Sequence, residues 1–263
     1  MGTAHYCRLK IIKIFSHKMI HFNIKPRKTK EMMTKKEFLK QWDKAKSFAN
    51  SGQLKLSIQT YEALVPLIND IKAVFPREDY ASDEHYIEQM HFEQAMFWGD
   101  FTASLCDEGQ FDSAIEASKK ALYHKEAANL STLLYIFFNT GNIYLLSQNY
   151  EEAIKWYDKA LYENECNKIW LNEKERADYY SNKAEALYFL GCYEEAEELF
   201  LKAIQTVQNY KNFEPFYFLK NIYELKNDTK QSEKFYKMFT TRKSKLSDED
   251  FLQRTRFYPI KID

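Results

Sequence analysis

Four asparagines are spread along the second half of this 263-residue chain, and their side chains suit one kind of chemistry, the recognition of peptide backbone. They are Asn139, Asn142, Asn182 and Asn221. One carboxamide can donate to a peptide C=O and accept from a peptide N–H, so it reads backbone without reading side chains. On one surface, the four would form a ladder along an extended peptide. An ordinary polar helix face would also carry asparagine, and this alternative stays open.

Enzymatic chemistry has little support in the sequence. The chain contains no GxSxG, HExxH, Walker or deaminase signature. Acidic pairs such as Glu151-Glu152 and Glu194-Glu195 open predicted helices, where we expect them to be solvated, whereas acid-base catalysis needs a buried pair facing a cleft. His124 ends an apolar stretch and is expected to interact with a helix C-terminus. We predict that the protein is not an enzyme and has no catalytic site, metal site or cofactor.

Two segments of similar sequence supply the helices that carry most of these asparagines. They read TGNIYLLSQNYEEAIKWYDKAL and NKAEALYFLGCYEEAEELFLKAI. When they are aligned, small residues recur twelve and then seven positions apart, with aromatic or large apolar residues between them. The aligned residues are Gly141, Tyr144, Tyr150, Ala153, Tyr157 and Ala160 in the first copy, and Ala184, Leu187, Tyr193, Ala196, Phe200 and Ala203 in the second. This pattern resembles the tetratricopeptide repeat, a pair of helices that cross where small residues let them touch.

Looser copies flank these two units. A first unit includes Ala45 and Ser57, a second includes Ala114, and a fifth is eroded, as expected of a terminal repeat. The resemblance implies an all-α fold, a right-handed α-solenoid of about five helix pairs over residues 34–245. A short capping helix and tail would follow over 246–263, with Ser247 as the N-cap residue.

Helix ends can be predicted in places. Thr34 and Glu37 have the spacing of a capping box at the start of the array. The second helix of the first unit is expected to run on to Phe75, and the next helix to begin early, near Ser82-Asp83. The unusually long spacing between the first and second units would be absorbed by these extended helices.

Bulk composition limits the class of protein. Mean hydropathy is -0.60 and no run of eighteen apolar residues occurs, so no segment is expected to span a membrane. The cysteines Cys7, Cys106, Cys166 and Cys192 form no CxxC pair, which favours a reducing cytoplasm over a disulfide framework. Net charge is zero, but residues 1–33 hold eight Lys/Arg and one Glu, +7, so residues 34–263 hold -7. An acidic body predicts no direct binding of nucleic acid.

The basic segment 1–33 has three interpretations. We favour a disordered leader or a mis-assigned start, with translation beginning at Met32 or Met33. A basic amphipathic helix on a membrane or an acidic partner is the sharper alternative. His17 and His21 could also share a metal ion, but nothing nearby supplies a third ligand.

The resemblance also implies a binding surface. In tetratricopeptide arrays the first helices of successive units line a concave groove that holds an extended peptide. The partner is therefore expected to be another protein or a peptide segment, with Tyr135 and Phe138 as aromatic anchors. The groove residues expected on this basis are Tyr135, Phe138, Asn139, Asn142, Asp178, Asn182, Glu185, Phe189 and Asn221.

Two known groove types can be compared with this sequence. Arrays that clamp a C-terminal carboxylate place Lys and Arg beside groove asparagines, whereas here Phe138, Glu214 and Phe218 occupy those places. Repeat length and the segment FFNTGNIY are similar to the bacterial quorum-sensing regulators Rap, PlcR and NprR. Those regulators carry an N-terminal effector domain for which 33 residues are too short. The expected function is a non-enzymatic adaptor. The alternative is a peptide-gated regulator without a DNA-binding domain of its own.

Overall fold

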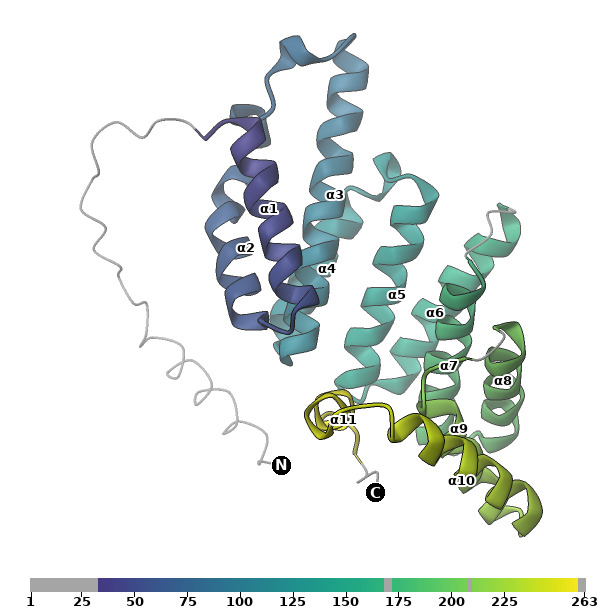
Figure 1. The fold of residues 1–263 in the computed structure, drawn as a ribbon. Helices are drawn as coiled ribbons and strands as arrows, with labels where there is room; N and C mark the ends of the chain where they lie inside the picture. The colour runs from purple at the N-terminus through teal and green to yellow at the C-terminus, as the bar shows by residue number, and fades with distance from the viewer. Residues whose placement is uncertain (1–32, 168–171, 208–209, 260–263) are drawn as a thin grey trace, which may run out of the picture. The chain divides into compact units, whose positions relative to one another are not determined.

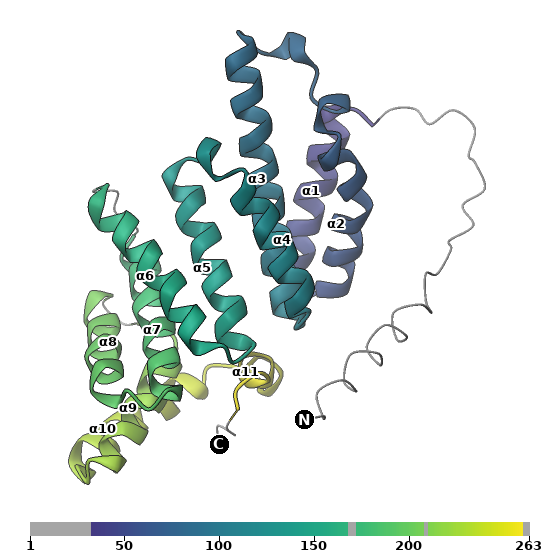
Figure 2. The same ribbon diagram turned by 180° about the vertical axis from the view of Figure 1, so that it is seen from behind.

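Every regular element in the described part of the chain is helical. A computed structural model describes residues 33–167, 172–207 and 210–259, so the interpretations of residues 1–32, including Cys7, His17 and His21, lie outside it. Eleven α-helices and three short 3-10 helices occur in those ranges, without strands (Figures 1 and 2). The α-helices are α1 (Lys35–Asn50), α2 (Leu54–Asn69), α3 (Asp83–Glu108), α4 (Phe111–Tyr123), α5 (Leu130–Leu146), α6 (Tyr150–Cys166), α7 (Glu173–Phe189), α8 (Tyr193–Thr206), α9 (Glu214–Leu225), α10 (Thr229–Lys243) and α11 (Asp248–Thr255).

The first ten helices form consecutive pairs. Each of α1, α3, α5, α7 and α9 packs most extensively on the helix that follows it. The first helices also contact one another in series, α3 with α5, α5 with α7 and α7 with α9. They therefore form a continuous row, which we call the first-helix surface. This arrangement confirms the predicted all-α solenoid of helix pairs.

Local signals set most helix starts as the sequence predicts. Thr34 and Glu37 form a capping box at α1, and the Ser82 side chain accepts from the His85 N–H at the start of the 26-residue helix α3. The prediction for the end of α2 is wrong. This helix stops at Asn69, and a separate 3-10 helix, Ile71–Ala73, follows. Asp70 adopts a non-helical backbone with ψ 54°, in keeping with the preference of Asn and Asp for helix ends over helix interiors.

Small residues lie where the helices of a pair touch. Ala153, Ala184 and Ala196 are completely buried. Gly141 on α5 faces Tyr157 on α6 so closely that an added Cβ would lie 2.6 Å from the Tyr157 ring. Tyr157 is itself fully buried and cannot move aside easily. The contact therefore requires glycine at position 141.

None of the helices in the described ranges has the length and apolar character that crossing a bilayer requires.

Gly141→Ala tests this contact, with Gly99→Ala as a matched control inside α3. Both changes gain helix propensity, but only the first places a methyl group inside van der Waals distance, since the nearest atom to a Cβ at residue 99 is 3.4 Å away. We expect Gly141→Ala to be less stable than Gly99→Ala by about 1–3 kcal/mol in urea unfolding, the usual cost of overpacking. Equal stabilities would show that the helices separate without penalty.

Candidate functional site

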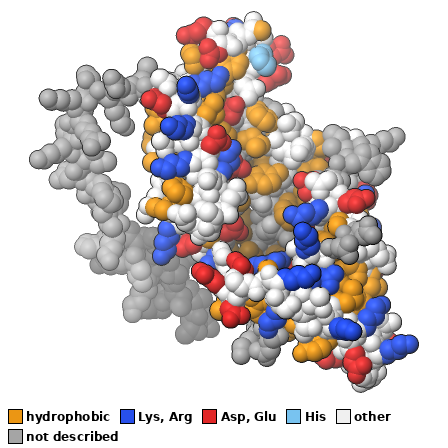
Figure 3. Space-filling model, viewed as in Figure 1, with side chains coloured by type: hydrophobic (Ala, Val, Ile, Leu, Met, Phe, Trp, Pro, Cys, Tyr) orange, Lys and Arg blue, Asp and Glu red, His pale blue; other side chains and the backbone are white. Residues whose placement is uncertain are grey.

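Two cavities open on the first-helix surface. The asparagine cavity, about 270 Å³, is lined by Phe138, Asn142, Leu145, Leu146, Asp178, Ser181, Asn182, Glu185, Asn212, Glu214, Arg254 and Tyr258. The acidic cavity, about 500 Å³, is lined by Met96, Asp100, Ser131, Thr132, Tyr135, Phe138, Asn139, Glu175, Asp178 and Tyr179. Phe138 and Asp178 line both cavities, so the two are neighbours. Figure 3 shows the molecule from the side of Figure 1, with hydrophobic side chains exposed in the hollowed middle of this face.

Seven of the nine predicted groove residues line these cavities. Tyr135 and Asn139 lie at the acidic cavity, Asn142, Asn182 and Glu185 at the asparagine cavity, and Phe138 and Asp178 at both. Phe189 and Asn221 line neither.

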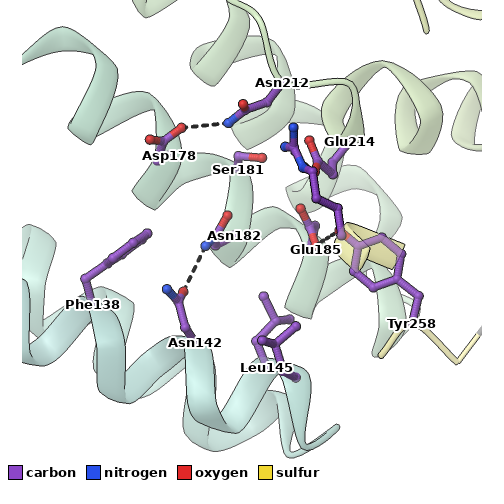
Figure 4. Close-up of a pocket in the computed structure, with 12 residues that line it drawn as sticks. Phe138, Asn142, Leu145, Asp178, Ser181, Asn182, Glu185, Asn212, Glu214 and Tyr258 are labelled. Carbon is purple, nitrogen blue, oxygen red and sulfur yellow. Dashed lines mark hydrogen bonds and ion pairs between the residues drawn. The ribbon is translucent and has the colours of Figure 1, made fainter. Parts of the chain in front are cut away.

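Asn142 and Asn182 are joined to each other inside the asparagine cavity (Figure 4). The Asn182 Nδ2 donates to Asn142 Oδ1 at 2.9 Å, and the Tyr157 hydroxyl donates to the same oxygen at 2.7 Å. These two hydrogen bonds fix the orientation of the Asn142 amide, and both are accepted by its oxygen. Asn142 Nδ2 and Asn182 Oδ1 make no hydrogen bond to any described residue. The pair therefore offers one donor and one acceptor to the cavity.

The other two asparagines have different surroundings. Asn139 is 7% exposed, and its Nδ2 is buried without a hydrogen-bond partner. Asn221 donates to the Tyr188 hydroxyl at 3.4 Å and accepts from Lys220 at 3.2 Å, away from both cavities. The structure brings three of the four asparagines to the cavities, and they do not form one uniform ladder.

The two predicted groove phenylalanines, Phe138 and Phe189, have different neighbours. Phe138 is stacked on Tyr179 with ring centroids 4.4 Å apart, and the pair forms part of the wall of the acidic cavity. Phe189 is stacked on Tyr150 at 5.1 Å and also contacts Tyr258 at 6.1 Å. Packing accounts for Phe189.

A pair of buried carboxylates lies at the asparagine cavity, although the sequence predicts none. Glu185 is 3% exposed and Glu214 is 7% exposed. Burial, and to a smaller extent the Glu214 charge, raise the pKa of Glu185 to about 8. The pKa of Glu214 is also raised, chiefly by burial. The sequence does not reveal this pair, because Glu185 and Glu214 are on different first helices, 29 positions apart.

The C-terminal segment, which consists of α11 and the residues after it, supplies the partners of this pair. Arg254 forms an ion pair with Glu214, and the Tyr258 hydroxyl donates to Glu185 at 2.8 Å (Figure 4). These contacts give the two buried carboxylates a structural role, the attachment of the C-terminal segment. The acidic pairs discussed from the sequence are those at helix starts, and this buried pair is not among them.

The same segment reaches back to the second helix pair. Phe257 packs on Phe111 at 5.1 Å and lies so close to Gly109 that a Cβ there would be 2.7 Å from its ring. Gly109 has a φ of +83°, which glycine adopts without strain. Ser247 caps α11 as predicted. The chain beyond this helix, however, crosses the first-helix surface from α9 to the turn between α3 and α4.

His124 lies at the C-terminus of α4, where the sequence places it, and it contacts a second histidine. It is the C-cap residue of α4, and its Nδ1 lies 2.7 Å from Nδ1 of His91. Burial and then the charge of His91 lower the pKa of His124 to about 4. With this pKa the ring is neutral at pH 7 and adds no positive charge at the helix end. No group of three or more metal-ligating side chains in the described ranges is arranged around a common point.

Comparison with known proteins defines the class of this fold. Two family models of the tetratricopeptide repeat match residues 135–165 and 177–206. The chain therefore contains tetratricopeptide repeats, and proteins of this repeat family are generally non-enzymatic scaffolds for protein–protein interactions. A search of curated proteins finds none that matches this chain.

Solved structures of the same architecture extend over most of the chain. A putative kinesin light chain from Podosopora anserina with nearly identical TPR-like repeats aligns with a TM-score of 0.57 at 14% identity, covering 80% of this chain and 96% of that one. BtubC (BKLC) from P. vanneervenii aligns at 0.56 and 15% identity, covering 78% and 83%. MamA from Desulfovibrio magneticus RS-1 aligns at 0.53 and 10% identity, covering 80% and 97%. At such identities the likeness shows the fold alone.

Asn142→Ala and Asn182→Ala are expected to differ in their effect on stability, because they remove different hydrogen bonds. Asn142→Ala removes the acceptor of the fully buried Tyr157 hydroxyl, whereas Asn182→Ala removes only a half-buried donor. We expect Asn142→Ala to lower the free energy of unfolding by about 1–2 kcal/mol, the cost of an unpaired buried group, and Asn182→Ala to change it by less than about 0.5 kcal/mol. Urea unfolding followed by circular dichroism measures both. Identical losses would contradict the bonding described.

Glu185 makes stability depend on pH. An ordinary glutamate titrates near 4.5 and Glu185 near 8, so between these values the folded chain holds a proton that the unfolded chain has released. The free energy of unfolding therefore decreases as pH rises from about 4.5 to 8, by at most about 1.4 kcal/mol per pH unit from this group. Glu185→Gln keeps an acceptor for Tyr258 and removes the titration.

We expect Glu185→Gln to match the wild type in stability near pH 5 and to exceed it near pH 8. Unfolding curves at both values, with the exposed Glu195→Gln as a control, make the comparison. Parallel pH profiles for Glu185→Gln and wild type would contradict a raised pKa at Glu185.

Proposed function

We propose that this protein is an adaptor that holds an extended peptide segment of another protein on its first-helix surface. The Asn142–Asn182 pair carries this proposal, because it presents a fixed donor and a fixed acceptor to the cavity. Those are the two groups that a peptide bond requires. The predicted residues Tyr135, Phe138, Asn139, Asp178 and Glu185 lie beside the pair.

The shape of the site supports a peptide more than a compact ligand. The two cavities are neighbours that share Phe138 and Asp178, so an extended chain can pass from one to the other. Three first helices, α3, α5 and α7, contribute to this path. The repeat family generally mediates protein–protein interactions, which favours a protein as the source of the peptide.

A peptide-gated regulator, the alternative function, has one observation in its favour. The C-terminal segment bridges α9, α7 and the α3–α4 turn through Arg254, Tyr258 and Phe257. A peptide entering the asparagine cavity competes with this bridge. Its release would change the spacing of the helix pairs, whereas an adaptor binds without such a change.

A random decapeptide library displayed on phage tests the proposed function. We expect peptides that bind the full chain to lose affinity by roughly 2–10-fold with Asn182→Ala, the effect of one neutral hydrogen bond. Asn167→Ala, an exposed asparagine beyond α6, is the control. Small-angle scattering of the complex distinguishes the two functions, since only the regulator changes its dimensions. Failure to select any peptide, or equal binding by Asn182→Ala, would contradict the groove assignment.

A further inference from the structure

Three carboxylates line the acidic cavity without a close ion-pair partner. Asp100, Glu175 and Asp178 line it, and neither Lys nor Arg is among its lining residues. None of the three makes an ion pair with another described residue. Asp100 and Asp178 are partly buried and Glu175 is exposed. Partly desolvated carboxylates without an ion-pair partner are unfavourable, so this cavity is complementary to a positive group.

The present partners of these carboxylates are neutral donors. Asp100 accepts from the Trp42 indole N–H at 3.0 Å and from the Tyr135 hydroxyl at 3.3 Å. Asp178 accepts from the Tyr210 hydroxyl at 2.6 Å and from Asn212 at 3.0 Å. Such bonds orient the carboxylates without neutralising them. Burial accordingly raises the pKa of Asp100 and of Asp178.

An independent observation comes from Asn139, which lines the same cavity. Its side chain is 93% buried and its Nδ2 has no acceptor. The Asn139 amide lies near the Tyr135 hydroxyl and lowers the pKa of Tyr135, against the larger increase caused by burial. Its Nδ2, however, forms no hydrogen bond of ordinary geometry with that oxygen. A peptide carbonyl would supply the missing acceptor. A bare cation or a polyamine would not.

The cavity walls are aromatic. Tyr135, Phe138 and Tyr179 line it, and the last two are stacked on each other. A guanidinium is planar and weakly hydrated, stacks on aromatic rings and binds carboxylates through two parallel N–H groups. Arginine meets these walls and carboxylates better than lysine does.

The chain itself provides an example on the same surface. Arg254 forms an ion pair with buried Glu214, and its guanidinium lies 4.8 Å from the centroid of the Phe213 ring. A carboxylate beside an aromatic ring thus already holds an arginine at the asparagine cavity. The acidic cavity repeats the combination without an arginine.

We propose that the acidic cavity binds an arginine side chain of the partner's extended peptide, with Asn139 donating to a peptide carbonyl beside that arginine. This inference rests on the proposed function and specifies its ligand. Asp100 and Glu175 bind the guanidinium from α3 and α7, and Phe138 covers its face. Asp178 lies where the peptide continues toward Asn142 and Asn182.

Decapeptides selected on the full chain provide the test. We expect arginine to be enriched at one position of the selected sequences. The tightest of them is then synthesised with arginine or with citrulline at that position, because citrulline keeps the shape and loses the charge. Calorimetric titration should show a roughly 10–100-fold weaker affinity for the citrulline peptide, the effect of a hydrogen bond to a charged group.

Variants of the cavity carboxylates test whether Asp100 and Glu175 bind the guanidinium. Glu175→Gln keeps the capping of α7, and Asp100→Asn keeps an acceptor for Trp42, so both should fold. We expect each to weaken the arginine peptide about tenfold or more and to leave the citrulline peptide unchanged. The exposed Glu195→Gln should affect neither peptide.

The outcomes separate the two proposals. An empty selection overturns peptide binding itself. Selected peptides without arginine enrichment, or equal affinities for arginine and citrulline peptides, overturn this inference and leave peptide binding standing. If a synthetic peptide of residues 24–33 binds more tightly than every selected peptide, the occupant is the chain's own basic sequence, and the assignment to a partner is wrong.

Discussion

The close approach of two helix backbones at Gly141 and Tyr157 is the contact on which the site depends. Because residue 141 has no side chain, the Tyr157 ring fits against the α5 backbone, and its hydroxyl reaches Asn142 on the same helix. The bond fixes the Asn142 amide, and Asn142 in turn fixes Asn182 on α7. One packing contact inside the third helix pair thereby orients polar groups on the surface of two pairs.

Aromatic side chains take part in both packing and polar organisation throughout the first-helix surface. Tyr179 is buried, and its hydroxyl donates to the Leu134 carbonyl while its ring is stacked on Phe138. Tyr135 lies at the acidic cavity and donates to Asp100. Tyrosine allows a tightly packed helix array to keep hydrogen-bond donors at fixed places near a cavity, since its ring is apolar and its tip is polar. The high aromatic content of this chain is explained by that dual role.

The sequence was sufficient to predict the fold and seven cavity residues for a physical reason. Spacing along a helix determines which residues share a face, and the small residues Gly141, Ala153, Ala184 and Ala196 mark the face that touches another helix. Asn142 lies one position after Gly141, and Asn182 lies two positions before Ala184, on the same helices. Their placement at a cavity needed only the repeat pattern.

The rest of the site depends on contacts between distant segments, which periodicity does not encode. Glu185 was expected on the groove, but its burial depends on Glu214 and on Tyr258, 73 positions away. Asp100 becomes part of the cavity because the long helix α3 runs beside α5. Phe189 and Asn221 also have the spacing of groove residues but line neither cavity, since Phe189 is stacked on Tyr150 and Asn221 donates to Tyr188.

The C-terminal segment determines how much of the first-helix surface a partner can reach. Arg254 and Tyr258 occupy the carboxylates at one end of the asparagine cavity, so the unpaired groups of that cavity lie toward Asn142, Asn182 and Asp178. Those groups are also the ones nearest the acidic cavity, and no residue of the C-terminal segment lines that cavity. In the proposed binding mode, a peptide that crosses Asp178 between the two cavities does not displace α11, and competition with the C-terminal segment begins only deeper in the asparagine cavity. Longer partners would extend to Glu185 and Glu214, where they would compete with the chain's own arginine and tyrosine.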